Sequence, residues 1–464
     1  MIKMKPQWKP KTKRIIFFLI IFFFLSIKIT QLFTQKGVAW DSAVYIEMGK
    51  YIFSGGNIGL WEASRPLFWP FILGFFWKIN LNPIIFGRII ELILAVGCIH
   101  LTYLIGKKVF DEYVGLLSSF FLAFSLTFLF YSSTILTGIP STFFSLLGVY
   151  FFIQHKYLAT GIFIGFSSMA RFLQLLVLIP LMLILLYFEK KKFKNLLTIT
   201  MGVLIISIPY LIINLFLYKN PIFPFILQSF MTKNTGWVFH QPLQFYFINL
   251  LRENFLLLFI IPGIILILKR PKEKNITILG IFLLFFLFFN LIAHKEMRFV
   301  IVFLPYMHLI TAYGISQSLI LEKHRKKVFY SLIALIILIP LTQTFGRITP
   351  PNYKEYPQFT DYLNKNEVNS GIWITNPVFM VSSNKKTDEL IYYPLFDSKR
   401  ISELNKNLKE AKHILIDTCD ILPCPQNDKE CEEKAINFLN SIKSDFDVVY
   451  NRKGGVCEQI ILAR

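Results

Sequence analysis

Apolar runs long enough to cross a bilayer recur along the first three quarters of the chain, and they restrict its fold more than any other feature. One helical span needs about 20 mostly apolar residues. Hydrophobic residues make up 54% of the sequence and charged residues 17%, whereas soluble domains carry roughly a quarter charged residues. A soluble core cannot hide so much apolar surface. The sequence therefore predicts a mainly α-helical, polytopic membrane protein.

Basic residues set the expected orientation. The formal net charge is +21, and lysines and arginines gather in short clusters between the apolar runs, which is typical of cytoplasmic loops rather than of nucleic-acid binding. About eleven transmembrane spans fit between residues 15 and 346, with cytoplasmic loops at Lys107, Lys191, Lys272 and Lys326. We expect a multi-pass cell-membrane protein with a retained first span, a cytoplasmic N-terminus and an extracytoplasmic C-terminal segment.

The chain changes character at about residue 347. Short β-type runs alternate there with helical patterning such as "CEEKAINFLNSIK"; the runs are "GIWIT", "LIYYPLF", "HILIDT", "DFDVVY" and "EQIILA". This alternation predicts a small α/β domain. We therefore expect a transmembrane domain over residues 1–346 and an extracytoplasmic α/β domain over residues 347–464.

Most cysteines belong to this C-terminal segment, namely Cys419, Cys424, Cys431 and Cys457. The sequence contains no C-x-x-C pair, which argues against a zinc site. Four cysteines in an extracytoplasmic domain favour two disulfides, whose connectivity the sequence leaves open. Cys98 lies in a predicted span, where we expect it to pack against its neighbours.

An aspartate, Asp41, stands just beyond the first span, in "AWDSAVYIEMGKYIFSGG". The spacing of Val44, Met48, Tyr51 and Ile52 predicts a helix with one apolar face. One interpretation makes Asp41 the N-cap of this helix, because a carboxylate accepts an orphan backbone N–H there. The other makes it a catalytic carboxylate at the membrane surface.

Few acids fall on the predicted outer side of the membrane domain: Asp41, Glu47, Glu62, Glu253 and Glu296. Glu91 lies within the second span, one turn from Arg88, and there we expect a structural ion pair. We take Asp41 as the candidate general base and Glu47, Glu62 and Glu296 as secondary acid candidates.

Several separate cations are predicted on the same side as Asp41. A reaction with a phosphate leaving group needs a carboxylate that takes a proton from the attacking hydroxyl and cations that stabilise the developing phosphate charge. For each cation alone, snorkelling at the membrane interface is the alternative. The candidates for binding the donor phosphate are Arg65, Arg171, His294, Lys295 and Arg298.

The order of these motifs resembles a known family. "WDSAVYIEMGKYI", "RPLFWPFILGFFWKI" and "GIFIGFSSMARFLQLLVLIP" are similar to segments of the GT-C superfamily of polytopic glycosyltransferases. This superfamily includes the protein O-mannosyltransferases and the lipid A aminoarabinose transferases. "HKEMRF" is similar to the H-K-E-x-R-F segment of the dolichyl-phosphate-mannose-dependent mannosyltransferases. The resemblance covers residues 15 to 345.

This resemblance implies inverting transfer of a sugar, mannosyl-like or another hexosyl group, from a polyprenyl-phosphate donor to an extracytoplasmic acceptor. Asp41 matches the family's catalytic acid, and Arg65 matches a basic position beside the lipid phosphate. Many members carry a second acid beside the first, but here Ser42 follows Asp41. We therefore expect no obligatory cofactor, and the sequence gives no support for a divalent metal.

Two other classes of membrane protein compete with this interpretation. A secondary transporter would show internal repeats and polar residues at the midplane, and the sequence shows no repeat. A lipid-linked-sugar flippase or a lipid-binding scaffold would share the cations but would not need Asp41. No Walker loop is present, which argues against an ATP-driven pump. The sugar and the acceptor, whether protein, lipid or glycan, stay open.

Overall fold

The computed structural model describes residues 9–321, 326–345, 347–391, 398–420, 429–454 and 457–464. It divides into two compact units. Unit 1 contains residues 1–35, 88–223 and 240–351, and unit 2 contains residues 36–87, 224–239 and 352–464. Unit 2 thus combines the segment after the first helix with the C-terminal segment. The expected domain boundary at residue 347 stays a prediction.

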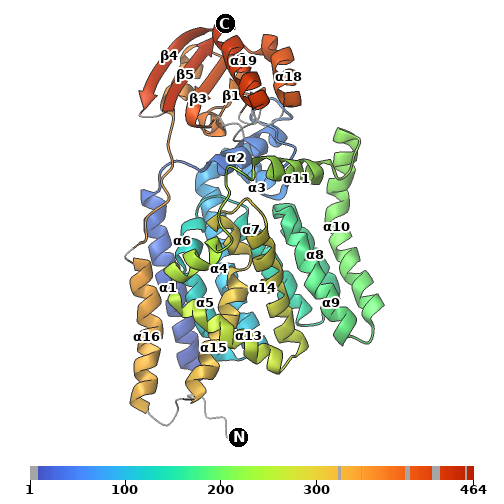
Figure 1. Ribbon diagram of the computed structural model, residues 1–464, viewed down its shortest axis with the longest axis vertical. Helices are drawn as coiled ribbons and strands as arrows, with labels where there is room; N and C mark the ends of the chain where they lie inside the picture. The colour runs from blue at the N-terminus through green and yellow to red at the C-terminus, as the bar shows by residue number, and fades with distance from the viewer. Residues whose placement is uncertain (1–8, 322–325, 346, 392–397, 421–428, 455–456) are drawn as a thin grey trace. The chain divides into compact units, whose positions relative to one another are not determined.

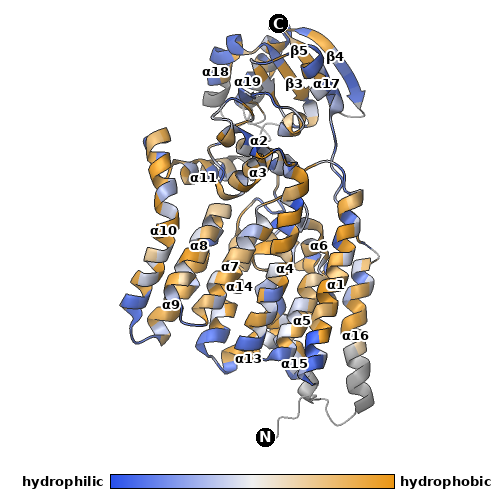
Figure 2. Ribbon diagram, turned by 180° about the vertical axis from the view of Figure 1, so that it is seen from behind, coloured by the Kyte–Doolittle hydropathy of each residue, from blue (hydrophilic) through white to orange (hydrophobic). Residues whose placement is uncertain are grey.

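Unit 1 is built from helices (Figure 1), most of them rich in hydrophobic residues (Figure 2). They are α1 (Pro10–Thr34), α4 (Pro83–Val109, apart from its first turn), α5 (Glu112–Ala123), α6 (Leu126–Tyr131), α7 (Gly138–Phe152), α8 (Tyr157–Ala170), α9 (Leu178–Phe188), α10 (Lys192–Tyr218), α12 (Phe245–Glu253), α13 (Ile260–Lys269), α14 (Glu273–Leu291), α15 (Leu304–Leu321) and α16 (Lys326–Phe345). Three 3₁₀ segments connect them: η1 (Phe172–Val177), η2 (Phe255–Phe259) and η3 (Met297–Val302). Hydrophilic residues gather at helix ends, for example near α9 and α13 (Figure 2).

Four of the described helices, α1, α4, α10 and α14, are long and apolar enough to cross a membrane. A fifth candidate joins α12 to η2 and α13 through a bend of 117°. In the most apolar windows of α1 and α10 only 22% of residues are buried within the protein, so their apolar side chains face outward, as lipid contact requires. The other predicted spans correspond to shorter apolar helices, and the count of about eleven stays a prediction.

The C-terminal segment forms the predicted α/β arrangement. Its five strands are β1 (Ile372–Ile374), β2 (Glu389–Leu390), β3 (His413–Asp417), β4 (Asp447–Gly454) and β5 (Cys457–Ala463), in the order β2-β1-β3-β5-β4. β1 pairs in parallel with β2 and β3, and β5 pairs antiparallel with β3 and β4. The helical elements are α17 (Pro357–Lys365), η4 (Pro377–Met380), α18 (Ser398–Asn407), η6 (Leu408–Glu410), η7 (Thr418–Asp420) and α19 (Lys429–Asp445).

Alternation along β3 gives this sheet two buried faces. Ile414 and Ile416 pack with residues of α18 and α19, whereas Leu415 packs with residues of α17 and η4. Successive strand residues point to opposite faces of a sheet, so "HILID" supplies both cores. The predicted strand "LIYYPLF" falls largely on residues 392–397, outside the described part of the chain.

One disulfide closes this domain, between Cys419 and Cys457, with the two Cα atoms 5.4 Å apart. It links the end of β3 to the start of β5. Cys424 and the Cys431 side chain lie outside the described residues. One of the two expected bridges is thus confirmed, and the second stays a prediction. Cys98 is a buried free cysteine, as expected.

Unit 2 also holds α2 (Trp40–Phe53), the helix predicted around Asp41, together with α3 (Phe68–Lys78) and α11 (Phe223–Thr235). α2 and α3 cross where Gly49 meets Gly74. A Cβ atom at Gly74 would lie 2.4 Å from the carbonyl oxygen of Gly49, and one at Gly49 would lie 2.6 Å from the backbone nitrogen of Gly74. Only glycine lets the two backbones approach this closely.

We expect Gly74→Ala to destabilise unit 2, because the added methyl group forces α2 and α3 apart. Overpacking of this kind costs about 1–3 kcal/mol. Gly138→Ala is a matched control, since its Cβ would meet nothing closer than 3.6 Å. Thermal unfolding followed by tryptophan fluorescence should show a lower midpoint for Gly74→Ala only. Equal midpoints for both variants would contradict the close crossing.

Candidate active site

Asp41 lies in the first turn of α2 and is not its N-cap. The helix begins at Trp40, and the N-cap residue is Ala39, which makes no side-chain capping bond. The capping interpretation of Asp41 is therefore wrong. The carboxylate instead forms an ion pair in which Asp41 Oδ1 lies 2.8 Å from an Arg65 terminal nitrogen. Both side chains keep partial access to solvent, with 14% of Asp41 and 16% of Arg65 exposed.

Arg65 is shared between two carboxylates. Its Nε lies 3.2 Å from Glu62 Oε1, and the hydroxyl of Ser64 donates to the same oxygen at 2.8 Å. The Arg65 guanidinium also lies over the ring of Tyr45, 5.7 Å from its centroid. Within the described residues, Glu62 Oε2 is buried and accepts no hydrogen bond. The site therefore presents two acids, Asp41 and Glu62, on one cation.

Glu47, the other acid of this loop, is unsuited to catalysis. Its side chain is fully buried and lies 2.8 Å from Lys50 Nζ. The Lys50 ammonium donates to the carbonyl oxygens of Val381 and Ser383 at 2.8 Å and to that of Met380 at 3.4 Å. Burial raises the pKa of Glu47 to about 7, against the opposing effect of Lys50. This pair anchors α2 to the segment after η4.

The predicted cationic cluster of unit 1 forms around Glu296. Glu296 Oε1 lies 2.6 Å from His294 Nε2 and 2.5 Å from an Arg298 terminal nitrogen. Arg171 is distant in sequence, but its guanidinium carbon lies 5.0 Å from the centroid of the Phe299 ring. The guanidinium carbon of Arg298 lies 5.6 Å from the same centroid. Phe299 is itself fixed by stacking on Phe289. The structure thus brings together four of the predicted residues: Arg171, His294, Glu296 and Arg298.

Lys295 differs from the other cations of this segment. Only 5% of it is exposed, and its ammonium donates to the carbonyl oxygens of Ile292 at 2.7 Å and Gln241 at 3.0 Å. These bonds tie two connecting segments together. Lys295 is therefore placed as a structural cation rather than as a phosphate ligand.

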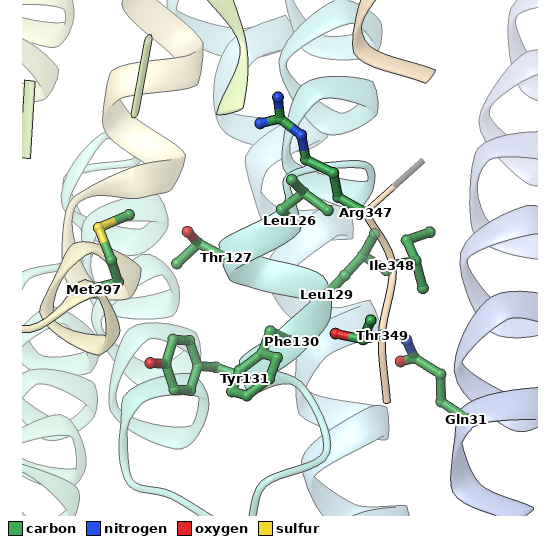
Figure 3. A pocket seen from close by; sticks show the side chains of 10 residues that line it. All are labelled: Gln31, Leu126, Thr127, Leu129, Phe130, Tyr131, Met297, Arg347, Ile348 and Thr349. Atoms are coloured by element: carbon green, nitrogen blue, oxygen red, sulfur yellow. The ribbon is translucent and has the colours of Figure 1, made fainter. Parts of the chain in front are cut away.

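A cavity of about 300 Å³ lies in unit 1. Its walls are mainly apolar, with one guanidinium and one phenol among the lining groups. Figure 3 shows that one wall is the short helix α6, with Met297 of η3 on one side and the segment 347–349 on the other. Sequence patterns gave no sign of this cavity, because its walls come from four separate segments.

The described residues contain two groups whose ligand atoms are close enough to share a metal ion. Asp417 is grouped with Cys419 and Cys457, but those two sulfurs form the disulfide. The other group joins His155, Glu189 and Glu273. Neither group contains Asp41 or Glu62, and a metal-independent reaction stays a prediction.

Comparison with protein families gives one match. The model of the Alg9-like mannosyltransferase family matches residues 63–383. The matched range includes Arg65 and the cluster around Glu296, and it begins after Asp41. No curated protein sequence matches the chain.

Solved structures with a similar fold come from bacteria and archaea. ArnT from Cupriavidus metallidurans bound to undecaprenyl phosphate has a TM-score of 0.61 at 10% identity, covering 96% of this chain and 97% of that chain. The Archaeoglobus fulgidus oligosaccharyltransferase tethered to an acceptor peptide has a TM-score of 0.62 at 12% identity, covering 89% and 70%. AglB from the same organism, with an inhibitory peptide and a dolichol-phosphate, has a TM-score of 0.58 at 12% identity, covering 86% and 69%.

We expect the buried Glu47 to make the stability of unit 2 depend on pH. Its folded pKa of about 7 exceeds its ordinary value of 4.5, so the folded state binds more protons between these values. The free energy of unfolding should therefore fall as pH rises from 4.5 to about 7, since ionising a buried carboxylate is costly.

Glu47→Gln should remove this dependence. Thermal midpoints measured from pH 4 to 8 should show the wild type losing stability relative to the variant up to about pH 7. The surface variant Asp361→Asn serves as a control that should leave the pH profile unchanged. A constant difference between wild type and Glu47→Gln across the range would contradict the assignment.

Proposed function

The chain belongs to the Alg9-like mannosyltransferase family, and we propose that it moves a sugar from a polyprenyl-phosphate donor to an extracytoplasmic acceptor with inversion, Asp41 acting as the general base. The GT-C resemblance of the motifs is confirmed by this family match and by the similar folds of ArnT and AglB. Together with several membrane-length apolar helices, it identifies a multi-pass membrane glycosyltransferase.

The observation that carries the proposal is the pairing of Asp41 with Arg65 in a partly exposed position. A base needs access to the acceptor hydroxyl, and the 14% exposure of Asp41 provides it, whereas Glu47 has none. A guanidinium suits a phosphate because it donates charge-assisted hydrogen bonds, and the Arg65 guanidinium lies between two carboxylates, with Nε near Glu62 and one terminal nitrogen near Asp41. A donor phosphate that accepts hydrogen bonds from Arg65 also weakens the ion pair between Arg65 and Asp41.

The proposed step is a single displacement at the anomeric carbon. An Asp41 carboxylate oxygen takes the proton of the acceptor hydroxyl while the hydroxyl oxygen bonds to the anomeric carbon. The bond from this carbon to the phosphate oxygen breaks, and both of its electrons leave with polyprenyl phosphate. Arg65 stabilises the charge that develops on the phosphate. Attack from the face opposite the leaving group inverts the configuration.

Within unit 1, the cations around Glu296 are proposed as phosphate ligands. Arg171 and Arg298 both lie on the ring of Phe299, and two guanidinium groups favour phosphate through charge-assisted hydrogen bonds. His294 belongs to the same cluster, because its Nε2 lies 2.6 Å from Glu296 Oε1. The mainly apolar cavity bounded by α6 and Arg347 suits an isoprenoid segment close to its phosphate.

The donor class follows from what similar proteins bind. ArnT was solved with undecaprenyl phosphate and AglB with a dolichol-phosphate, and we carry a polyprenyl-phosphate donor over to this chain. The disulfide between Cys419 and Cys457 supports an oxidising, extracytoplasmic compartment for the C-terminal segment and its acceptor. With the predicted odd number of spans, about eleven, the N-terminus is then cytoplasmic.

We expect Asp41→Asn to abolish sugar transfer while the protein stays folded. An amide cannot hold the proton of the acceptor, and loss of a general base costs about 10²–10⁴ in rate. The assay offers the purified protein a panel of labelled polyprenyl-phosphate sugars, with polyprenyl-phosphate mannose first, and measures transfer or release. The surface variant Asp361→Asn controls for the change of charge. Near-normal transfer by Asp41→Asn would refute the base assignment, and Glu62 would be the next candidate.

The roles of Arg298 and Lys295 can be separated in the same assay. Arg298→Ala should raise the KM for the donor by about tenfold to a hundredfold, because a charge-assisted hydrogen bond contributes about 1.5–3 kcal/mol. Lys295→Ala should instead lower the thermal midpoint and leave the donor KM of the folded fraction unchanged, since its ammonium holds two carbonyl groups. A raised donor KM for Lys295→Ala with an unchanged KM for Arg298→Ala would show instead that Lys295 binds the donor and Arg298 does not.

A further inference from the structure

The wall of the cavity formed by α6 is held in an unusual way. α6 has only six residues, from Leu126 to Tyr131, too few for a helix that is stable by itself. It nevertheless supplies half of the lining residues in Figure 3, including Leu129, Phe130 and Tyr131. Contacts outside α6 must therefore fix its position.

A buried carboxylate holds the start of α6. Glu253, at the end of α12, accepts hydrogen bonds from the hydroxyl of Ser125 and from both the hydroxyl and the backbone N–H of Thr127. These donors belong to the N-terminal turn, where a negative charge is favoured. Glu253 was one of the acids predicted on the outer side, and here it serves as an anchor.

The segment that follows α6 is a buried loop. All six residues from Ser132 to Thr137 are buried, and four of them are less than 2% exposed. Buried loops are rare because their backbone groups lose water without gaining helix or sheet partners. Polar side chains of the neighbouring spans replace that water. Gln35 donates to the carbonyl oxygen of Ser133 at 3.0 Å, and Lys28 donates to the Ser133 hydroxyl at 2.8 Å and to the Leu129 carbonyl oxygen at 2.7 Å.

Glu91 of α4 also restrains this loop. Its two carboxylate oxygens accept the backbone N–H groups of Ile135 at 2.6 Å and of Leu136 at 3.1 Å. Ile135 has a φ angle of +60°, a conformation that is a genuine outlier for a β-branched residue. Such strain persists only where surrounding contacts enforce it, and it clusters at functional sites. Arg88 and Lys28 also interact with Glu91 electrostatically.

We propose that Glu91 is a positioning residue of the transfer reaction: it holds the strained loop 132–137 so that α6 presents Leu129, Phe130 and Tyr131 to the cavity. The inference rests on the proposed function, since it makes this cavity part of the donor site. Glu91 itself touches no substrate in this scheme. When the Glu91 carboxylate is lost, Ile135 relaxes to a negative φ angle. The loop then shifts, and the cavity wall formed by α6 shifts with it.

The test is Glu91→Gln, which keeps the shape of the side chain. A glutamine offers one acceptor oxygen, and its NH₂ group repels the second N–H. With polyprenyl-phosphate mannose as donor, we expect KM to rise about tenfold, equivalent to about 1.4 kcal/mol, while kcat stays within about twofold, because only ground-state placement of the lipid is lost. Glu189→Gln, at a different helix end of unit 1, is the matched control and should leave both constants unchanged.

A second pair of variants isolates the backbone strain. Ile135→Ala and Ile135→Gly both remove the buried side chain, but only glycine adopts a positive φ angle without cost. Adding Glu91→Gln to the alanine variant should therefore raise the donor KM by about tenfold, whereas adding it to the glycine variant should raise it by less than about threefold. A purely structural role would lower the active fraction equally in both backgrounds and leave KM unchanged.

Amide hydrogen exchange gives a readout that does not depend on catalysis. The peptide covering residues 129–137 should exchange faster in Glu91→Gln than in wild type, and this increase should be larger in the Ile135→Ala background than in the Ile135→Gly background. An unchanged KM, an equal rise in both backgrounds or unchanged exchange would overturn the inference. A wild-type protein that transfers no sugar from any donor would refute the proposed function, and the exchange comparison would still decide whether Glu91 holds the loop.

Discussion

In an apolar environment every backbone N–H and C=O group must find its hydrogen-bond partner within the protein, and the arrangement of unit 1 depends on this constraint. The helices meet it internally. The buried loop 132–137 does not, so polar residues inside or beside the spans supply the missing partners: Lys28 in α1, Gln35 at its C-cap, and Glu91 in α4. Glu253 does the same for the first turn of α6. Ionisable residues that look costly in a membrane segment are thus the groups that stabilise an irregular cavity wall.

The buried lysines and the partly exposed arginines have different roles. Lys50 and Lys295 direct their ammonium groups at backbone carbonyl oxygens and are buried, so they tie segments together. Arg65 and Arg298 stay partly exposed and pair with carboxylates. This difference follows from their chemistry, because an ammonium places its few donors around one point, whereas a planar guanidinium with five donors can keep a structural contact and still face a phosphate. Three of the proposed phosphate ligands, Arg65, Arg171 and Arg298, are accordingly arginines.

Much of the fold was predictable because its signals are local. The apolar runs indicated the helices of unit 1, and the short β-type runs "HILIDT" and "EQIILA" indicated β3 and β5 of an α/β sheet. The apolar spacing after Asp41 predicted α2, and the closely spaced His294, Glu296 and Arg298 were expected to act together and do form one cluster. In each case the relevant residues are neighbours in the sequence, so the repeat of the helix or strand fixes their relation.

The sequence by itself determined a polytopic helical protein with a small α/β segment and marked Asp41 as a candidate base. Only the tertiary structure decided which residues meet. It paired Asp41 with Arg65, separated Glu62 at the site from Glu47 in the core, and joined Cys419 to Cys457. It also placed Asp41 in the first turn of α2 rather than at the N-cap, and it gave Glu91 two backbone amides as partners. These contacts join segments distant in sequence, and their geometry depends on how helices pack, as at the glycine crossing of α2 and α3, which no local pattern of residues encodes.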